Sequence, residues 1–276
     1  MRKFKIALLQ MKVVETKASN LSRAVEMIAK AARAGADLIV LPEMFNCPYQ
    51  TAKFPQYAEQ EGGYTWQELS RAASDYQVLL IGGSVPEEDR SGRVYNTSYI
   101  FNQQGEQIGK HRKMHLFDIN IRGGQVFKES ATLTAGDRIT VMMTPYGKMG
   151  VMICYDLRFP ELARLMVQAG AEFIVVPGAF NMTTGPVHWE LLFRARAVDN
   201  QVYMIGVAPA RQEHSSYVSY GHSLIVDPWG RVVSQLGAAA GSLITEVDLT
   251  LLDQIKQELP LLKHRRKDIY ALRELR

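Results

Sequence analysis

The chain has 276 residues, 47% apolar and 22% charged, a composition typical of one large globular domain, which we place at residues 1–276 with a C-terminal tail from about residue 258. The net charge is +4, and residues 263–276 account for all of it. A nucleic-acid-binding protein carries a basic face built into its fold, so nucleic acid is not expected as a partner. Two cysteines are too few for a disulfide framework, which is typical of a cytoplasmic protein. No apolar run approaches the ~18 residues of a membrane-spanning helix, and the apolar stretch that ends at Gln10 is too short for a signal peptide. We therefore expect a cytoplasmic protein that makes no membrane contact.

The first predicted elements are a strand, a helix and a second strand. Residues 5–10 form an apolar run typical of a buried strand. Apolar side chains then recur with helical spacing over residues 21–32, and Gly35 is typical of a helix end. Residues 37–41 predict the second strand, which Pro42 ends. Together these segments predict a β-α-β unit.

The middle of the chain predicts a helix followed by antiparallel strands. Thr65 and Glu68 have the spacing of a capping box that opens a helix. Residues 78–85 predict a strand, and residues 95–101 and 107–111 predict the two arms of a hairpin.

A second β-α-β unit follows. Residues 149–153 predict a strand, residues 159–169 a helix ended by Gly170, and residues 172–176 another strand ended by Pro177.

Segments 35–42 and 170–177 match closely in their pattern of glycine, acidic residue, apolar run and proline. The match indicates either an internal repeat, with two α-β halves that face each other, or the ordinary succession of helix, glycine, strand and proline in α/β proteins.

The rest of the chain predicts a helix at 186–200, a strand at 202–207, a hairpin of 224–226 and 231–234, and a last strand at 243–247. Many strands with covering helices predict a layered α/β domain.

Cys154 directly follows a predicted strand and precedes a predicted helix. A nucleophile at such a turn is held rigidly and faces a cleft, and the N–H groups that follow, beginning with that of Tyr155, can stabilise an oxyanion. Most free cysteines are instead small core residues. Because the polar residues Asp156 and Arg158 come next, we interpret Cys154 as a nucleophile.

A thiol needs a base or a positive neighbour to react at neutral pH. Glu43 follows a predicted buried strand at its carboxyl end, where open α/β sheets bind ligands. Lys113 follows a predicted hairpin arm, and its ammonium would lower the pKa of a nearby thiol. Taken singly, Glu43 could be an exposed loop residue and Lys113 part of a solvated run of charges.

His111 and His115 are four residues apart, as metal ligands on a helix can be. Lysine and arginine residues surround them and oppose a dication, so both are interpreted as structural or substrate-edge residues. We therefore expect neither a metal nor a cofactor.

Three separated segments together resemble a known signature, namely Leu41-Pro42-Glu43, residues 112–116 (Arg-Lys-Met-His-Leu) and residues 153–161 (Ile-Cys-Tyr-Asp-Leu-Arg-Phe-Pro-Glu). In this order and spacing they are similar to the Glu-Lys-Cys signature of the nitrilase superfamily of carbon-nitrogen hydrolases, and the resemblance extends from the first strand to about Tyr270. It implies an α/β fold, an α-β-β-α sandwich. It also implies a homodimer, with the contact on a sandwich face near the helix after Cys154.

Residues 177–201, Gly221-His222-Ser223 and residues 227–230 resemble the omega-amidase branch of this superfamily. That branch hydrolyses the terminal amide of short α-keto dicarboxylic monoamides, such as α-ketoglutaramate and α-ketosuccinamate, to the acid and ammonia. The alternatives are an amidase for deaminated glutathione, an N-carbamoyl amino acid hydrolase, a true nitrilase, or a non-catalytic binding protein on this fold.

The resemblance also implies a role for each matching residue. The base falls on Glu43, the oxyanion-holding lysine on Lys113, the nucleophile on Cys154 and a second, positioning glutamate on Glu129. A substrate carboxylate would be bound by Arg158, whose alternative is a structural ion pair with Asp156 or Glu161. The remaining positions near the substrate are Tyr49, Tyr155, Phe180 and Thr184.

Overall fold

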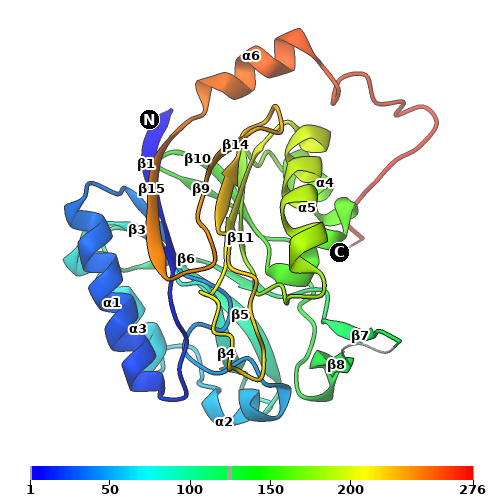
Figure 1. Ribbon diagram of the computed structural model, residues 1–276. Helices are drawn as coiled ribbons and strands as arrows, with labels where there is room; N and C mark the ends of the chain where they lie inside the picture. The colour runs from blue at the N-terminus through cyan, green and yellow to red at the C-terminus, as the bar shows by residue number, and fades with distance from the viewer. Residues whose placement is uncertain (1, 123–125, 276) are drawn as a thin grey trace.

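Two β-sheets with helices on both outer faces make up the protein (Figure 1). The computed structural model describes residues 2–122 and 126–275. The elements before residue 131 are β1 (Lys3–Gln10), α1 (Lys17–Arg33), β2 (Leu38–Val40), α2 (Phe54–Tyr57), α3 (Tyr64–Asp75), β3 (Leu79–Ile81), β4 (Val85–Glu88), β5 (Val94–Phe101), β6 (Gln107–Arg112), β7 (Asp118–Asn120) and β8 (Val126–Lys128). Those after residue 140 are β9 (Val141–Thr144), β10 (Gly147–Val151), α4 (Pro160–Gln168), β11 (Phe173–Pro177), α5 (Gly185–Asn200), β12 (Tyr203–Val207), β13 (Leu224–Val226), β14 (Val232–Gln235), β15 (Gly241–Asp248) and α6 (Thr250–Glu258). Single 3₁₀ turns lie at Thr51–Lys53, Glu129–Ala131 and Cys154–Arg158.

The strands of the described residues form two large sheets and a small ribbon. One sheet has seven strands, in the order β15-β1-β2-β3-β5-β4 with β6 beside β5. The other has six strands, in the order β14-β13-β12-β11-β10-β9, and β7 pairs with β8 alone. Each large sheet therefore combines parallel strands in its middle with antiparallel strands at its edges.

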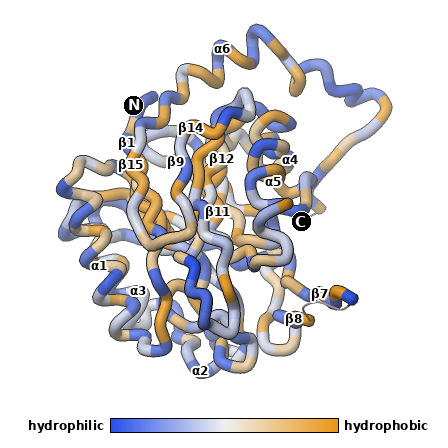
Figure 2. The backbone as a smooth tube through the Cα atoms, viewed as in Figure 1, coloured by the Kyte–Doolittle hydropathy of each residue, from blue (hydrophilic) through white to orange (hydrophobic). Residues whose placement is uncertain are grey.

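The main core lies between the two sheets. Alternate residues of β1, Phe4, Ile6 and Leu8, point into it and pack with residues of the facing sheet such as Phe173 and Ile205. The intervening residues of a strand point to the opposite face. Figure 2 shows the hydrophobic residues gathered along the strands, whereas α6 alternates between hydrophobic and hydrophilic positions.

Two further cores lie on the outer faces of the sheets. On the seven-stranded sheet, α1 and α3 bury their apolar faces, with Ile28 and Leu69 among the contacting residues. On the six-stranded sheet, α4 and α5 do the same, with Met166 and Trp189. The layers are therefore α-β-β-α, which confirms the predicted α/β sandwich.

Both predicted β-α-β units are present, one in each sheet. The parallel strands β1 and β2 are joined by α1, and β10 and β11 are joined by α4. Gly35 and Gly170 follow the two helices with φ of +84° and +98°, which L-residues with side chains rarely adopt. The matching segments of the sequence therefore occupy corresponding places in facing sheets.

Two local predictions are wrong. Thr65 does not cap a helix: α3 begins at Tyr64, and the Thr65 hydroxyl donates to the Glu59 carboxylate (2.8 Å). Residues 78–85 are not one strand, because β3 ends at Ile81 and the chain turns before β4. At Gly83 φ is +57°, and a Cβ there would lie 2.1 Å from the backbone oxygen of Pro42, so only glycine permits the turn.

The C-terminal tail leaves the sandwich after α6 and carries no helix or strand over residues 259–275. Figure 1 shows it running outward from α6 and returning toward the α4–α5 face. Arg265 and Tyr270 there lie close enough to Arg164 of α4 to affect its pKa. Among the described residues, every helix is too short or too polar to span a bilayer.

Candidate active site

Four of the residues singled out from the sequence meet in one buried cluster between the sheets. Glu43 follows β2, Lys113 follows β6, Glu129 begins a 3₁₀ turn after β8, and Cys154 begins another after β10. The Lys113 Nζ atom lies 2.9 Å from Glu43 Oε1 and 2.9 Å from Glu129 Oε1. The lysine and both carboxylates are buried, and Cys154 is 4% exposed.

The Cys154 backbone adopts an unusual conformation. Its φ is +48°, in the left-handed region that few non-glycine residues occupy. Gly178, directly after β11, packs against this turn, and a Cβ at Gly178 would lie 3.3 Å from the Cα atom of Cys154. The strand ends on both sides thus fix the direction of the thiol.

The Glu43 carboxylate is the centre of the hydrogen bonds in the cluster. Its Oε1 atom accepts from Lys113 and from Asn96 Nδ2 (2.9 Å). The Tyr49 hydroxyl oxygen lies 3.2 Å from the same atom, and its one proton has a nearer acceptor in Glu129. The Oε2 atom of Glu43 accepts from the Ala179 N–H (2.8 Å). Burial raises the pKa of Glu43, and the ammonium of Lys113 acts in the opposite direction. Because three donors hold it, the carboxylate has a fixed orientation.

Glu129 holds the other side of the ammonium. Its Oε1 atom accepts from the Tyr49 hydroxyl (2.8 Å) as well as from Lys113, and its Oε2 atom accepts from the Phe117 N–H (2.7 Å). Burial acts to lower the pKa of Lys113, but the carboxylates of Glu129 and Glu43 raise it, so the lysine is charged.

The thiol of Cys154 is protonated in this environment. Burial, and next the charge of Glu43, raises its pKa well above the ordinary value, while Lys113 acts to lower it. With two carboxylates and one ammonium the cluster already carries a net negative charge, and a thiolate would add a second. The thiol therefore needs to lose its proton to a base as it reacts, and Glu43 interacts with it directly.

Arg158 lies in the 3₁₀ turn that Cys154 opens, and no carboxylate of the described residues is within ion-pair distance of it. Its guanidinium lies over the ring of Phe180, 4.6 Å from the ring centroid, and 5.7 Å from that of Tyr155. Its Nη1 atom is 3.1 Å from Nδ1 of His188, on α5. Burial lowers the pKa of Arg158. The alternative of a structural ion pair with Asp156 or Glu161 is therefore wrong.

The other residues predicted near a substrate lie around this arginine or beside the cluster. Tyr155 makes edge contacts with Phe117 and Phe159, and Phe180 is buried against Trp189. Thr184 precedes α5, where its hydroxyl donates to Asn181 Oδ1 (3.1 Å). A contact between Thr184 and a substrate stays a prediction.

Three residues of the site were not predicted from the sequence. Asn96, in β5, donates to Glu43, and its only advance signal is a polar residue inside a buried strand. Tyr217 donates its hydroxyl to the Ala179 carbonyl and packs against Tyr49 with ring centroids 4.4 Å apart. His188 contacts Arg158, and nothing in its sequence context indicates this role.

The two histidines near Lys113 bind a common carboxylate. His111 and His115 both bind the buried carboxylate of Asp156 through ring nitrogens, at 3.1 and 2.8 Å. Within the residues that the structure describes, no three His, Cys, Asp or Glu side chains are grouped as a metal site would require.

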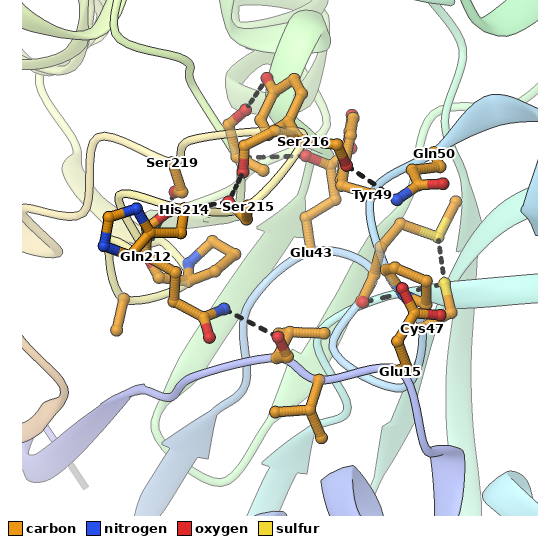
Figure 3. A pocket seen from close by; sticks show the side chains of 18 residues that line it. Glu15, Glu43, Cys47, Tyr49, Gln50, Gln212, His214, Ser215, Ser216 and Ser219 are labelled. Carbon is orange, nitrogen blue, oxygen red and sulfur yellow. Dashed lines mark hydrogen bonds between the residues drawn. The ribbon is translucent and has the colours of Figure 1, made fainter.

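A cavity of about 420 Å³ adjoins the cluster on the side of Glu43. The predicted pocket residue Tyr49 lines it, together with Glu43, Cys47 and Ala179, and residues 209–219 contribute another wall. Figure 3 shows Gln50 hydrogen-bonded to Ser216, at 2.7 Å, which joins two of the loops around the cavity. Residues 118–120 and 126–128 form the β7–β8 ribbon, and residues 123–125 lie outside the described residues.

Comparison with known proteins identifies the family to which the chain belongs. The omega-amidase NIT2 of Mus musculus is 49% identical over 272 residues, which cover 99% of this chain and 98% of that one. The omega-amidase NIT2 of Homo sapiens is 46% identical with the same coverage. The crystal structure of Saccharomyces cerevisiae Nit3, a member of branch 10 of the nitrilase superfamily, superposes with a TM-score of 0.89 at 44% identity and covers 96% of this chain and 97% of that one. Residues 5–257 match the carbon-nitrogen hydrolase family model, and the protein belongs to this family.

Proposed function

We propose that the protein is an omega-amidase, which hydrolyses the terminal amide of short α-keto dicarboxylic monoamides such as α-ketoglutaramate and α-ketosuccinamate to the acid and ammonia. The observation that carries this proposal is the half-buried cation of Arg158, which has no carboxylate partner among the described residues, in the same turn as the Cys154 thiol. Relatives named omega-amidase are 46–50% identical over nearly the whole chain, which supports the same substrate class.

Acylation begins at the Cys154 thiol. The Glu43 carboxylate takes the thiol proton as Sγ forms a bond to the amide carbon. The ammonium of Lys113 and the N–H of Tyr155, a residue in the first turn of a 3₁₀ segment, hold the oxyanion. Protonated Glu43 then gives its proton to the leaving nitrogen, the C–N bond breaks, ammonia departs and a thioester remains.

Deacylation repeats these steps with water. Glu43 takes a proton from water as its oxygen attacks the thioester carbon, and Lys113 again stabilises the oxyanion. The C–S bond then breaks, the sulfur recovers its proton from Glu43, and the dicarboxylic acid leaves. Glu129 and Asn96 act as positioning residues, because they hold Lys113 and Glu43 through hydrogen bonds of 2.9 Å each.

Arg158 selects substrates with a far carboxylate. A short α-keto ω-amide carries its only fixed charge at the end opposite the reacting amide. The planar guanidinium can bond both oxygens of that carboxylate, and the rings of Phe180 and Tyr155 keep its plane in place. We assign Thr184 to the same end of the substrate.

Replacing Arg158 with methionine tests the proposal. Truncating one partner of a buried charged pair costs ~2–5 kcal/mol, so Arg158→Met is expected to lower kcat/KM for α-ketoglutaramate by roughly 30-fold to a few thousand-fold. A neutral amide of similar length is expected to lose much less. Ammonia release from both substrates gives the two values.

Arg164→Met is the matched control, since Arg164 is also a partly buried arginine, on α4, whose pKa burial lowers. It is expected to keep the wild-type ratio between the two substrates. Equal losses on the charged and the neutral amide in Arg158→Met would contradict the proposal. A panel that adds deaminated glutathione and N-carbamoyl amino acids separates the other amidase branches.

We also propose that the protein is a cytoplasmic homodimer that pairs through the outer face of α5. Val187 and Leu191 on this helix are 61% and 62% exposed, and Trp229 beside them is 45% exposed. They line a groove of about 660 Å³. An exposed apolar patch of this kind is typical of a protein–protein contact. Because α5 packs beside α4, the patch lies on the sandwich face near the helix that follows Cys154.

A further inference from the structure

We propose that Asp156 is a positioning residue, which holds the segment of Lys113 and the turn of Cys154 in a fixed relation across the two sheets. This inference rests on the proposed function only in that an amide must react at Cys154. Asp156 is fully buried and its hydrogen bonds go to Ile153, His111 and His115, so its contribution is made through the two segments it joins.

One oxygen of the Asp156 carboxylate binds the nucleophile side. Its Oδ2 atom accepts from the N–H of Ile153, the residue directly before Cys154, at 3.0 Å. The same atom lies 3.1 Å from Nε2 of His111, which is two residues before Lys113. A single oxygen thus contacts both segments.

The other oxygen binds the segment on the far side of Lys113. Its Oδ1 atom accepts from the N–H of His115 (2.9 Å) and lies 2.8 Å from the Nδ1 atom of the same residue. His115 is two residues after Lys113. The Asp156 carboxylate therefore binds the chain two residues before and two residues after Lys113, and Asp156 itself lies two residues after the nucleophile.

Further contacts hold the rings of the two histidines in place. The His111 Nδ1 atom lies 2.9 Å from the Thr140 hydroxyl. The ring of His115 stacks on Phe159, with centroids 3.7 Å apart. Burial acts to raise the pKa of Asp156, but the hydrogen bonds from His111 and His115 lower it far below the ordinary range. The residue is accordingly a carboxylate with four donors around two oxygens, which leaves it a single arrangement.

This arrangement matters because the two catalytic groups come from different sheets. Lys113 follows β6 of the seven-stranded sheet, and Cys154 follows β10 of the six-stranded sheet. The ammonium has to lie within hydrogen-bond distance of an oxygen on the carbon that Sγ attacks, so a shift of one sheet against the other would separate them. A misplacement of about 1 Å can cost about 100-fold in rate.

Asp156→Asn tests the role with almost no change in volume. An amide has one acceptor and one donor end, so its NH₂ group must face either Ile153 and His111 or the two donors of His115. We expect kcat to fall about 100-fold while KM stays within about threefold, because Arg158 still binds the substrate.

Asp227→Asn is the matched control. Asp227 is also buried, and its Oδ1 atom accepts two backbone N–H groups, those of Trp229 and Arg231, in the turn between β13 and β14. The control is expected to lose thermal stability but to keep kcat. If Asp156→Asn keeps kcat within twofold of the wild type, or loses activity only in proportion to its unfolded fraction as the control does, Asp156 is merely structural.

His115→Phe covers the case in which Asp156→Asn does not fold. It keeps the ring stack and the backbone N–H and removes one donor to Asp156, and the side chain it replaces is 29% exposed. We expect kcat to fall about 10-fold with KM unchanged, because the Asp156 carboxylate loses one of its four donors and keeps the other three. An unchanged kcat would overturn the proposal.

A second measurement separates this inference from the choice of substrate. The alkylation of Cys154 by iodoacetamide needs no turnover of a keto acid, and we expect it to slow in Asp156→Asn and His115→Phe but not in Asp227→Asn. Slower alkylation in an enzyme that does not accept α-ketoglutaramate would support the role of Asp156 and contradict the omega-amidase proposal. Unchanged alkylation would contradict the role of Asp156 whatever the substrate.

Discussion

At the scale of single residues, the site holds more negative than positive charges. One ammonium, Lys113, lies between two buried carboxylates, Glu43 and Glu129. A single buried carboxylate beside an ammonium would be a stable ion pair and a weak base. Burial raises the pKa of Glu43, the ammonium of Lys113 acts to lower it, and the charge of Glu129 raises it further, which suits Glu43 to the proposed role of base for Cys154. In the proposed mechanism Glu129 thus supports the base without touching the substrate.

Substitution of Cys154 is the direct test of the nucleophile. Cys154→Ala and Cys154→Ser are expected to abolish ammonia release, because neither side chain can form the thioester, and to leave the circular dichroism spectrum unchanged. Cys47→Ala is the control, since Cys47 is also a buried free thiol, and burial raises its pKa as well. If Cys154→Ala keeps more than a few per cent of activity, or if Cys47→Ala loses activity with a normal melting curve, the nucleophile is not Cys154.

Residues that follow a strand were predictable from the sequence, and residues that reach the site across a strand pair were not. Glu43 and Cys154 come directly after apolar runs that end in a turn, and the resemblance to a family signature joined them with Lys113. Asn96 lies within β5, where it pairs with Pro86 of β4, and its side chain reaches Glu43, which follows β2, only in the assembled sheet. His188 reaches Arg158 from a helix 30 residues away, so no local pattern reveals the contact.

At the scale of elements, periodicity predicted the helices and most strands, and steric detail decided where they end. The segment 78–85 was predicted as one strand although Gly82-Gly83-Ser84 within it is typical of a turn, and the close approach of Gly83 to Pro42 divides it into β3 and β4. Thr65 and Glu68 have capping-box spacing, yet Glu59 accepts from both the N–H and the hydroxyl of Thr65. The carboxylate of Glu59, which precedes the helix, thus takes the place of the predicted capping box.

The start of α6 gives a test by pH. The Asp248 carboxylate accepts from the N–H (3.0 Å) and the hydroxyl (2.6 Å) of Thr250, and Lys3 Nζ lies 2.9 Å from it. The Thr250 hydroxyl and then Lys3 lower its pKa to about 2. Because this pKa is below the ~3.9 of an unfolded aspartate, the stabilisation is present above pH ~4 and is lost as the pH falls toward 2.

Asp248→Asn is therefore expected to lower the free energy of unfolding at pH 7, and the difference from the wild type is expected to shrink between pH 4 and pH 2. Urea unfolding followed by fluorescence at several pH values measures it. A difference that stays constant over this range would mean that the carboxylate charge does not contribute.

At the scale of the whole molecule, the sandwich explains why one chain can bring its catalytic groups together. Each sheet contributes strand ends to the same edge, so Glu43 and Lys113 of one sheet meet Cys154 of the other. The apolar run of β1 predicts a strand buried on both faces, and its residues do alternate between the inner and outer cores. The sequence does not reveal which residues face which core or the register between the sheets, because both depend on the packing of the two inner faces.

The proposed dimer makes a prediction at this scale. Leu191→Glu places a charge in the exposed apolar patch of α5, and burying it against a partner without a counter-ion is costly. The wild type is expected to show about twice its chain mass of 31.0 kDa in light scattering at micromolar concentration, and the variant about the chain mass.

Tyr64→Glu is the control for this change, because Tyr64 is 54% exposed on α3, on the opposite outer face. It is expected to leave the mass unchanged. A fully active wild-type monomer, or a Leu191→Glu variant that stays as large as the wild type, would contradict pairing through α5.

The left-handed backbone of Cys154 has an evolutionary consequence. A non-glycine residue in that region costs of order 1 kcal/mol or more, and Cys154 is one of five described non-glycine residues that bear this cost. Glycine would relieve the strain at Cys154, so selection for stability alone would favour glycine there, and only selection for the proposed nucleophile opposes it. In a lineage that no longer needs the reaction, replacement of Cys154 by glycine would therefore be favoured.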